Sequence, residues 1–359
     1  MTVVPEEHDF PDYPAAWYLF GTSAEVGRRP VSKERLGGRL VAFRTSAGEV
    51  AVLEAACSHL AADLERGRVV GDCLQCPFHH WEYSADGKCR RIPAGEPIPR
   101  FAAQRAFPVL ERHGLIFFWN GVRSQFPLPF FAGLDPDGFV RGRPFYFTAD
   151  CSWVMLVANG FDGQHFHAVH DRRLLAPPRV DSPEPHARRV RYQAEIVGDS
   201  LFDRLLKRLA GGTVEISITN YGGPLVLVTG QFQRARSCML ISAHRLAEHE
   251  TLAEVVVFAP RATSTTARGL GQWLNLEIRQ WFTRGLFQDD IARLSRIRYR
   301  SRSLVGSDAM LADFLRWVAE LPRNDFPLGT AGQARGAVKG LAPAIGVIPA
   351  PSLIEESIL

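Results

Sequence analysis

The hydrophobic pattern of the first third of the chain predicts short β-strands. Residues 40–44 and 50–54 are rich in apolar and β-branched side chains, and Ser46-Ala47-Gly48 between them is typical of a hairpin turn. The same pattern predicts further strands at residues 17–20, 71–74, 81–83, 89–92, 107–111 and 115–119. Runs this short and this frequent favour a small all-β domain over residues 16–125, preceded by a polar arm at residues 1–15.

The pattern changes after a connector rich in Pro and Gly, which we place at residues 126–143. Long alternating or apolar runs then predict antiparallel strands at residues 145–148, 188–197, 213–219, 225–233, 238–246 and 251–258. Helices are expected to begin near residue 153 and to cover residues 270–298 and 309–321. Residues 144–331 are therefore expected to form an α+β domain, and residues 332–359 a tail that is either loosely ordered or a strap over that domain.

Composition narrows the possible functions. Of 359 residues, 46% are hydrophobic and 22% are charged, as in ordinary globular proteins with sizeable cores. The net charge of +4, without a Lys/Arg run interleaved with aromatic residues, argues against a nucleic-acid partner. No signal peptide or bilayer-length apolar run is visible, and six Cys do not suggest a disulfide framework, so we expect a cytoplasmic protein without a transmembrane segment.

Two short motifs in the first domain each offer one thiolate and one imidazole. Cys-Ser-His occupies positions 57–59, and Cys-Pro-Phe-His occupies positions 76–79, after sixteen intervening residues. In an iron–sulfur cluster of the Rieske type, two Cys hold one iron and two His hold the other. Two such turns about one hairpin apart suit this centre. The expected cluster ligands are Cys57, His59, Cys76 and His79.

A zinc site is the alternative interpretation of these residues. Cys73 and Cys76 form a Cys-x-x-Cys pair, which could bind zinc together with His59 or His79. No second Cys-x-x-Cys exists, and the Cys-x-His motif would then be left unexplained. We therefore favour the cluster and interpret Cys73 as a packed or spare thiol.

A second group of potential ligands follows the connector, within residues 159–170. Two imidazoles and one carboxylate with open coordination positions form the facial triad of non-haem ferrous oxygenases. His165 and His170 are five residues apart, which corresponds to about 140° on a straight helix. Both can bind one iron only if the helix is distorted or ends between them, and Gly160 and Gly163 make this plausible.

With both groups in place, the chain resembles the catalytic α subunit of a Rieske non-haem iron oxygenase over nearly its whole length. The resemblance makes His165 and His170 iron ligands and Asp162 a carboxylate that bridges the two metal centres. The family's third iron ligand is an Asp on a late helix, for which we favour Asp289, with Asp290 as the second choice. His167 is a competing but less favoured ligand, and His80 departs from the Gly that is common after the second cluster His.

The resemblance also implies an architecture and a reaction. It implies a small all-β Rieske [2Fe-2S] domain and an α+β catalytic domain with a large antiparallel sheet and covering helices, similar to a helix-grip fold. A flavin reductase or ferredoxin, drawing on NAD(P)H, would supply electrons to the cluster and then to a mononuclear Fe(II) that activates O2. The expected assembly is a homotrimer, in which the path between the metals crosses from one subunit to the next.

The substrate implied by the resemblance is a hydrophobic small molecule, for example a polycyclic or steroid-like compound, and monooxygenation is the favoured reaction. Dihydroxylation, demethylation and desaturation of an aromatic or natural-product substrate remain alternatives, as does an electron-transfer protein without oxygenase chemistry. The pocket is expected beside the large sheet, with Val157, Phe161, Val226 and Val228 as candidate lining residues. A basic surface for an acidic electron donor could be formed by Arg66, Arg68, Lys88, Arg90 and Arg91.

Overall fold

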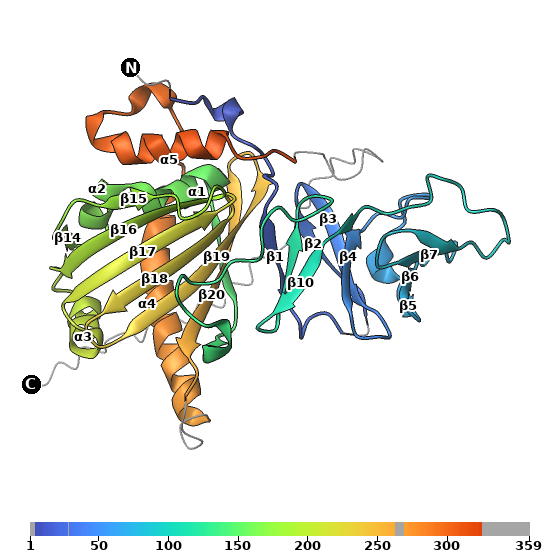
Figure 1. The fold of residues 1–359 in the computed structure, drawn as a ribbon, viewed down its shortest axis with the longest axis horizontal. Helices are drawn as coiled ribbons and strands as arrows, with labels where there is room; N and C mark the ends of the chain where they lie inside the picture. The colour runs from blue at the N-terminus through green and yellow to red at the C-terminus, as the bar shows by residue number, and fades with distance from the viewer. Residues whose placement is uncertain (1–3, 28, 263–268, 325–359) are drawn as a thin grey trace, which may run out of the picture. The chain divides into compact units, whose positions relative to one another are not determined.

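Three small antiparallel sheets form from the first third of the chain in the computed structural model, which describes residues 4–27, 29–262 and 269–324 (Figure 1). The first sheet has the order β1 (Trp17–Thr22), β11 (Leu115–Trp119), β10 (Val109–Arg112). The second has the order β2 (Val31–Arg35), β3 (Gly38–Arg44), β4 (Val50–Glu54), β9 (Ala106–Phe107). The third has the order β5 (Arg68–Val70), β6 (Cys73–Gln75), β7 (Glu82–Ser84), β8 (Cys89–Arg91).

The expected hairpin at residues 45–49 joins β3 to β4. Leu40 pairs with Glu54 and Arg44 with Val50, and the backbone N–H of Thr45 donates to the carbonyl of Glu49 at 2.8 Å. Gly48 has a φ of 88°, a left-handed conformation that glycine adopts without the steric cost of a Cβ. The strands predicted for the first domain are thus present, and strands β2 and β5 are additions that the hydrophobic pattern did not reveal.

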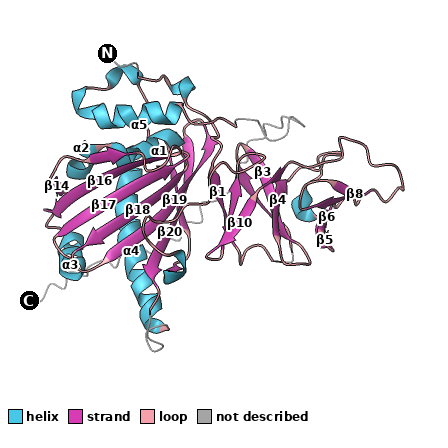
Figure 2. Cartoon of the chain, viewed as in Figure 1, coloured by secondary structure: helices cyan, strands magenta, loops and turns pink. Residues whose placement is uncertain are grey.

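The rest of the chain builds one nine-stranded antiparallel sheet (Figure 2). Its main path runs β12 (Phe139–Arg141), β20 (Glu250–Pro260), β19 (Arg236–Ala247), β18 (Leu225–Phe232), β17 (Thr213–Tyr221), β16 (Ala187–Ile196), β14 (Arg172–Leu174). Two further strands join it, β13 (Phe145–Ala149) on β20 and β15 (Arg179–Asp181) on β16. Strand β12 falls within the segment expected to be a connector, where its three residues pair with the end of β20.

Five α-helices accompany this sheet in the described part of the chain. They are α1 (Trp153–Ala158), α2 (Gly163–Ala168), α3 (Leu201–Ala210), α4 (Leu270–Leu294) and α5 (Ala309–Ala319). Helix α4 crosses one face of the sheet and packs on β13 and β20 (Figure 1). Short 3-10 turns are η1 (Glu7–Asp9), η2 (Leu64–Arg66), η3 (Pro136–Gly138), η4 (Asn159–Phe161), η5 (Ser301–Ser303) and η6 (Gly306–Asp308). The architecture expected from the sequence is therefore confirmed: a small β domain and a large antiparallel sheet with helices.

A shared apolar core joins the first of the small sheets to the large one. Trp17 and Trp119 from the first sheet share a buried cluster with Leu225, Leu240 and Phe258 from the large sheet. The indole N–H of Trp17 donates to the carbonyl of Phe126 at 2.9 Å. The described residues all belong to one compact unit.

A buried ion pair connects the second small sheet to the large one. Arg35, at the end of β2, donates to Glu254 on β20 at 2.9 Å, and both side chains are buried. Burial alone would raise the pKa of Glu254, but the Arg35 guanidinium and the His244 hydrogen bond lower it to about 2. Glu254 is therefore ionised and paired, as a buried charge requires.

The domain boundaries assigned above remain predictions, and the expected tail at residues 332–359 lies outside the described residues. None of the helices that the structure describes is long and apolar enough to cross a membrane.

Candidate functional site: two metal centres and an apolar cavity

Two tight turns carry the four expected cluster ligands. In the first turn, the backbone N–H of Cys57 donates to the carbonyl of Ala62 at 2.9 Å, and the N–H of Ala61 donates back to Cys57 at 2.8 Å. In the second turn, the N–H of Cys76 donates to the carbonyl of Trp81 at 2.8 Å. Each turn therefore fixes the backbone of its cysteine.

The structure brings the two cysteines together and the two histidines together. Cys57 and Cys76 are buried, and their thiols are hydrogen-bonded to each other. This contact lowers the pKa of Cys57 and raises that of Cys76. The imidazole rings of His59 and His79 lie 4.6 Å apart. Two thiols in contact and two imidazoles in contact, carried by the same two turns, are the side chains that a Rieske cluster would need.

The two histidines differ in their surroundings. The ring of His59 stacks on Trp81, with centroids 4.5 Å apart and planes within 3° of parallel. His79 is exposed, as are its neighbours Phe78 and His80. The tip that carries the second turn is therefore open to a partner molecule on the His79 side.

Tyr83, on β7, supports the first cysteine. Its hydroxyl lies 3.1 Å from the Sγ of Cys57 and 2.9 Å from the Oγ of Ser58. Burial raises the pKa of Tyr83, so the phenol keeps its proton and can donate to a thiolate. Cys73, the other half of the Cys-x-x-Cys pair, lies on β6 and pairs with Ser84 across the ladder.

His165 and His170 meet because helix α2 ends between them. The helix stops at Ala168, Val169 is its last cap, and Asp171 then takes a φ of 50° as the chain turns towards β14. As a result the Nε2 atoms of His165 and His170 lie 3.0 Å apart, with the rings nearly perpendicular. The sequence had required a helix that is distorted or ends at this point, and the structure shows that it ends.

A carboxylate from α4 completes the group, and it is Asp290. Its Oδ1 lies 2.8 Å from the Nε2 of His165 and 2.9 Å from the Nε2 of His170. Burial raises the pKa of Asp290, but the two neighbouring imidazoles lower it by more, so the net direction is downward. Among the described residues, this is the one group of three His, Cys, Asp or Glu side chains whose ligand atoms converge closely enough to hold a metal ion.

The preference for Asp289 is therefore corrected. Asp289 is exposed, whereas Asp290 faces the two imidazoles one helix position later. One residue along an α-helix rotates a side chain by about 100°, so only one of two adjacent carboxylates can face the site. His167 is exposed on α2 and does not join the group.

The spacing of the three ligand atoms is explained better by coordination of a cation than by hydrogen bonds among them. The two imidazole nitrogens can share only one hydrogen bond between them, and the Oδ1 of Asp290 is buried without a well-aligned hydrogen-bond donor among the described residues. Ligands on adjacent corners of an octahedron, each about 2.1 Å from its centre, lie about 3.0 Å apart, which is the spacing seen here. A group of two His and one Asp is consistent with a mononuclear iron.

Asp162 caps the helix that carries His165. Its Oδ1 accepts from the backbone N–H groups of Gln164 at 2.9 Å and His165 at 3.3 Å. Its Oδ2 makes no hydrogen bond or ion pair within the described part of the chain. The side-chain amide nitrogen of Asn159 lies 3.3 Å from the Nε2 of His165.

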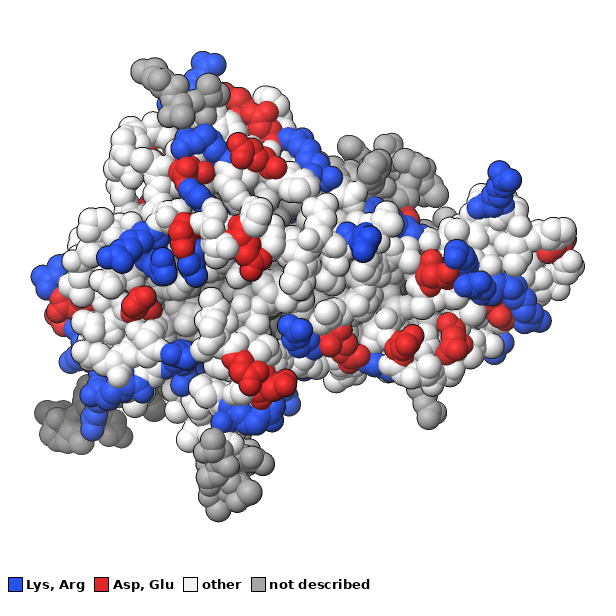
Figure 3. Space-filling model, in the orientation of Figure 1, with Lys and Arg blue, Asp and Glu red and all other residues white. Residues whose placement is uncertain are grey.

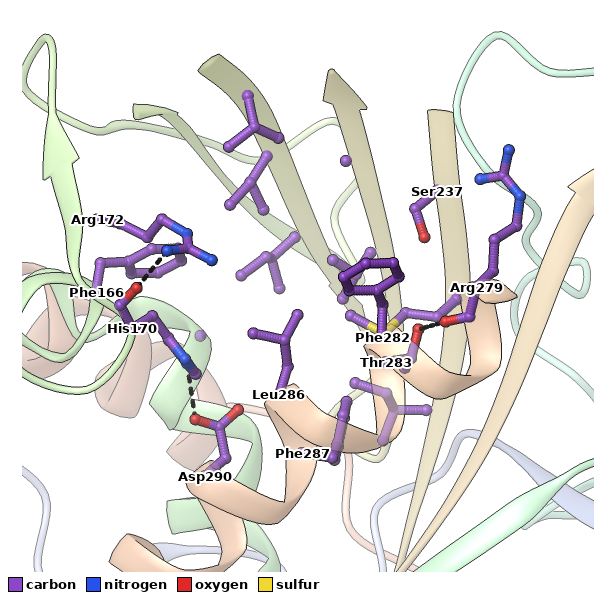
Figure 4. Close-up of a pocket in the computed structure, with 18 of the residues that line it drawn as sticks. Phe166, His170, Arg172, Ser237, Arg279, Phe282, Thr283, Leu286, Phe287 and Asp290 are labelled. Carbon is purple, nitrogen blue, oxygen red and sulfur yellow. Dashed lines mark hydrogen bonds and ion pairs between the residues drawn. The ribbon is translucent and has the colours of Figure 1, made fainter. Parts of the chain in front are cut away.

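A cavity of about 380 Å³ opens beside this group, between the sheet and α4 (Figure 4). Its walls are mostly aliphatic and aromatic, and they include Val157, Val226 and Val228, as expected from the sequence. Phe161, the fourth expected lining residue, is instead buried against Phe314, with ring centroids 4.0 Å apart. The cavity thus places a mostly apolar space directly beside the His–His–Asp group.

The sequence analysis missed two charged groups at this cavity. Arg172, on β14, donates to the carbonyl of His170 at 2.5 Å and to Asp203 at 2.9 Å, and both members of this ion pair are buried. Arg279 on α4 also lines the cavity. Helix α3, which carries Asp203, was itself missed, although Ser200 caps it in the pattern typical of a helix start.

Comparisons with known proteins agree with this geometry. A family model described as the Rieske [2Fe-2S] domain matches residues 16–102. The aminopyrrolnitrin oxygenase PrnD of Pseudomonas fluorescens is 36% identical over 165 residues, which cover 44% of this chain and 46% of that protein. The oxygenase component of 3-ketosteroid-9-alpha-monooxygenase from Rhodococcus rhodochrous is 33% identical over 241 residues, 58% of this chain and 61% of that protein.

A solved structure shares the fold beyond these matches. Dicamba monooxygenase bound to dicamba superimposes with a TM-score of 0.64 at 20% identity, over 85% of this chain and 97% of that one. At this identity the likeness concerns the fold alone. The chain spans about half of the length of one curated relative named above and about three fifths of the other. The chain therefore carries a Rieske [2Fe-2S] domain at residues 16–102 and is similar to oxygenase components of Rieske non-haem iron oxygenases.

Proposed function

We propose that this chain uses O2 and electrons from an NAD(P)H-linked donor to hydroxylate a hydrophobic small molecule. The observation that carries the proposal is the placement of His165, His170 and Asp290 in the wall of an apolar cavity. A metal site of this composition leaves coordination positions open, and the cavity brings a substrate next to them. Monooxygenation is the reaction we favour, because the similar proteins include a 3-ketosteroid-9-alpha-monooxygenase as well as an aminopyrrolnitrin oxygenase.

This chain supplies candidate ligands for both proposed metal centres. Cys57, Cys76, His59 and His79 would hold a [2Fe-2S] cluster, and His165, His170 and Asp290 would hold the mononuclear iron. When bound, the cluster passes electrons one at a time, and a ferrous ion with open positions activates dioxygen beside the substrate. The Tyr83 hydroxyl near Cys57 stabilises the charge on that sulfur.

The cavity walls orient the substrate and exclude water. Val157, Val226 and Val228 cover the space beside the ligand group, and Phe166 packs between His170 and Tyr192. The Arg172–Asp203 pair fixes the carbonyl of His170 and so holds the residue that follows α2 in place. These contacts favour one position of the substrate carbon relative to the ligand group.

The electron donor is expected to be a ferredoxin or a flavin reductase that docks near the exposed His79. The basic surface expected there is weaker than the sequence suggested, because Lys88 and Arg90 pair with Asp86, and Arg91 pairs with Glu82. Basic and acidic side chains are interspersed over the face shown in Figure 3. Contact by shape and apolar side chains, such as Phe78, therefore contributes alongside charge.

We also propose that the active assembly is a homotrimer in which Asp162 links two metal centres. The exposed His79 of one subunit would approach the free Oδ2 of Asp162 in the next, while Oδ1 holds the turn that carries His165. A carboxylate that accepts hydrogen bonds from two ligand imidazoles fixes their tautomers and couples them.

The test is electron paramagnetic resonance of the reduced, anaerobic protein after addition of nitric oxide, which binds an open position of a ferrous facial triad. We expect a ferrous-nitrosyl signal beside the reduced Rieske signal. We also expect the nitrosyl signal to change with one class among steroid-like, aromatic and alkaloid compounds. Fully metallated protein without the nitrosyl signal would leave only an electron carrier of the Rieske type.

A further inference from the structure

One face of helix α4 lines the cavity along most of its length. Arg279, Phe282, Thr283, Leu286, Phe287 and Asp290 all contribute to the wall (Figure 4). Their spacing of three and four residues is that of a single helical face. The face is apolar in the middle and carries one ionisable side chain at each end.

The two charged ends are far apart but in phase. Eleven residues separate Arg279 from Asp290, which at 1.5 Å per residue is about 16 Å along the axis, and the rotation between them is only about 20°. Figure 4 shows Arg279 beside Ser237 at the end of the cavity opposite His170 and Asp290. A ligand that reaches both ends must therefore be elongated.

Arg279 differs from the other guanidinium of the cavity in having no acidic partner. Arg172 is neutralised by Asp203 at 2.9 Å. Arg279 donates through Nε to the side-chain carbonyl of Asn275 at 2.8 Å and through Nη1 to the backbone carbonyl of Arg236. Both partners are uncharged. Within the described residues, Arg279 forms no ion pair, and Nη2 makes no hydrogen bond.

A half-buried guanidinium without a counter-charge is costly unless a ligand supplies one. The Arg279 side chain is half-buried, and this burial lowers its pKa because it disfavours the charged form. Charged groups in such positions are usually paired with an opposite charge. The neighbouring thiol of Cys238 does not supply a negative counter-charge, because burial raises its pKa to about 11 and keeps it neutral.

We propose that the substrate is an elongated apolar acid, whose carboxylate binds Arg279 and whose far end lies beside the His165–His170–Asp290 group. This inference rests on the proposed function for the chemistry at the far end, but the acid site itself does not. Arg279 is a binding residue that selects and orients the substrate. The apolar face between Phe282 and Phe287 receives its hydrocarbon body.

The experiment is calorimetric titration of the fully metallated protein, under anaerobic conditions, with matched acids and alcohols. Dodecanoate is compared with dodecan-1-ol, and the fused-ring acid abietate with its alcohol, abietinol. For at least one pair the acid is expected to bind roughly tenfold or more tightly, which corresponds to one hydrogen bond between charged groups. If no acid binds more tightly than its alcohol, the proposal is overturned.

Variants test whether the Arg279 side chain causes the preference for the acid over the alcohol. Arg279→Met is expected to abolish the preference for the acid, and Arg279→Lys to keep part of it. Arg284→Met makes the same chemical change on the same helix, but Arg284 is exposed and outside the cavity wall, so the preference is expected to stay. An acid preference that survives in a folded Arg279→Met protein overturns the proposal. Circular dichroism establishes folding, and Arg279→Lys provides the second test if Arg279→Met does not fold.

The nitrosyl signal separates this inference from the proposed function. A signal without any preference for acids removes the acid site and leaves the oxygenase proposal standing. Arg279-dependent acid binding without a signal supports the acid site and removes the oxygenase chemistry.

Discussion

The Oδ1 atom of Asp290 lies 2.8 Å from the Nε2 atom of His165, although the two residues are 125 positions apart in the chain. This contact joins the late helix α4 to the end of α2. It also decides between two adjacent carboxylates, because Asp289 is exposed. The iron ligand proposed on α4 is therefore Asp290.

Asp290→Ala is expected to weaken binding of the mononuclear iron by more than about tenfold, because a charged ligand is lost. Asp289→Ala serves as the matched control and should leave the iron in place. Iron content and the nitrosyl signal of both variants check this. Loss of the signal in Asp289→Ala with retention in Asp290→Ala would contradict the assignment.

Substitutions at Asp162 separate its capping role from its proposed bridging role. Asp162→Asn keeps a carbonyl oxygen that can accept from the N–H groups of Gln164 and His165, so both metals should stay bound. Asp162→Ala also removes the cap, at a cost of about 1 kcal/mol in the free energy of unfolding.

Turnover measured with a native or surrogate electron donor is expected to fall strongly in both Asp162 variants. Full turnover in Asp162→Asn would remove the bridging role. A loss confined to Asp162→Ala would point to the cap instead.

The Tyr83 hydroxyl beside Cys57 is expected to raise the reduction potential of the cluster, because hydrogen bonds to a cluster sulfur stabilise the reduced, more negative state. Tyr83→Phe should lower the potential by roughly 40 mV, the equivalent of about 1 kcal/mol for one electron. Potentiometric titration of the Rieske signal measures the change. Tyr146→Phe, at an exposed tyrosine, is the control, and an unchanged potential in Tyr83→Phe would exclude the effect.

His80 adopts a φ of 58° in the second cluster turn, which is a left-handed conformation. Such a conformation costs a side-chain-bearing residue about 1–2 kcal/mol, part of which glycine gives back through its greater freedom in the unfolded chain. His80→Gly should therefore raise the free energy of unfolding by about 0.5–1 kcal/mol.

Thermal unfolding of the metallated protein measures this effect. Arg208→Gly serves as a control with the opposite expected sign. Arg208 is exposed on α3, where glycine should lower the free energy of unfolding by about 1 kcal/mol. Destabilisation by His80→Gly would show that the histidine side chain makes a compensating contact.

Much of this arrangement could be predicted from local sequence, because the signals are local. Hairpin turns and alternating strands are indicated by short stretches of neighbouring residues. The same holds for the Cys-x-His and Cys-Pro-Phe-His turns. If His165 and His170 bind one iron, helix geometry requires the helix to be distorted or to end between them, and it ends at Ala168. Helix α3 also carried a readable signal, since Ser200 caps it and apolar residues repeat along it.

Features that depend on how distant helices and strands pack against one another could not be predicted from local sequence. The choice between Asp289 and Asp290 requires the rotational phase of α4 against the cavity, which is set by packing on the sheet. The pairing of Arg172 with Asp203 links residues 31 positions apart, from a strand and a helix that nothing in their sequences connects. Strand β12 formed in a Pro- and Gly-rich segment because the end of β20 offered it a partner.

The central claim is that one chain holds both a Rieske cluster and a separate mononuclear iron. Determination of iron and acid-labile sulfide per chain, in protein reconstituted anaerobically, tests it most directly. The two proposed centres together predict about three irons and two sulfides per chain, falling to about two irons in Asp290→Ala with sulfide unchanged. Two irons and two sulfides in the unaltered protein, with no effect of Asp290→Ala, would contradict the claim.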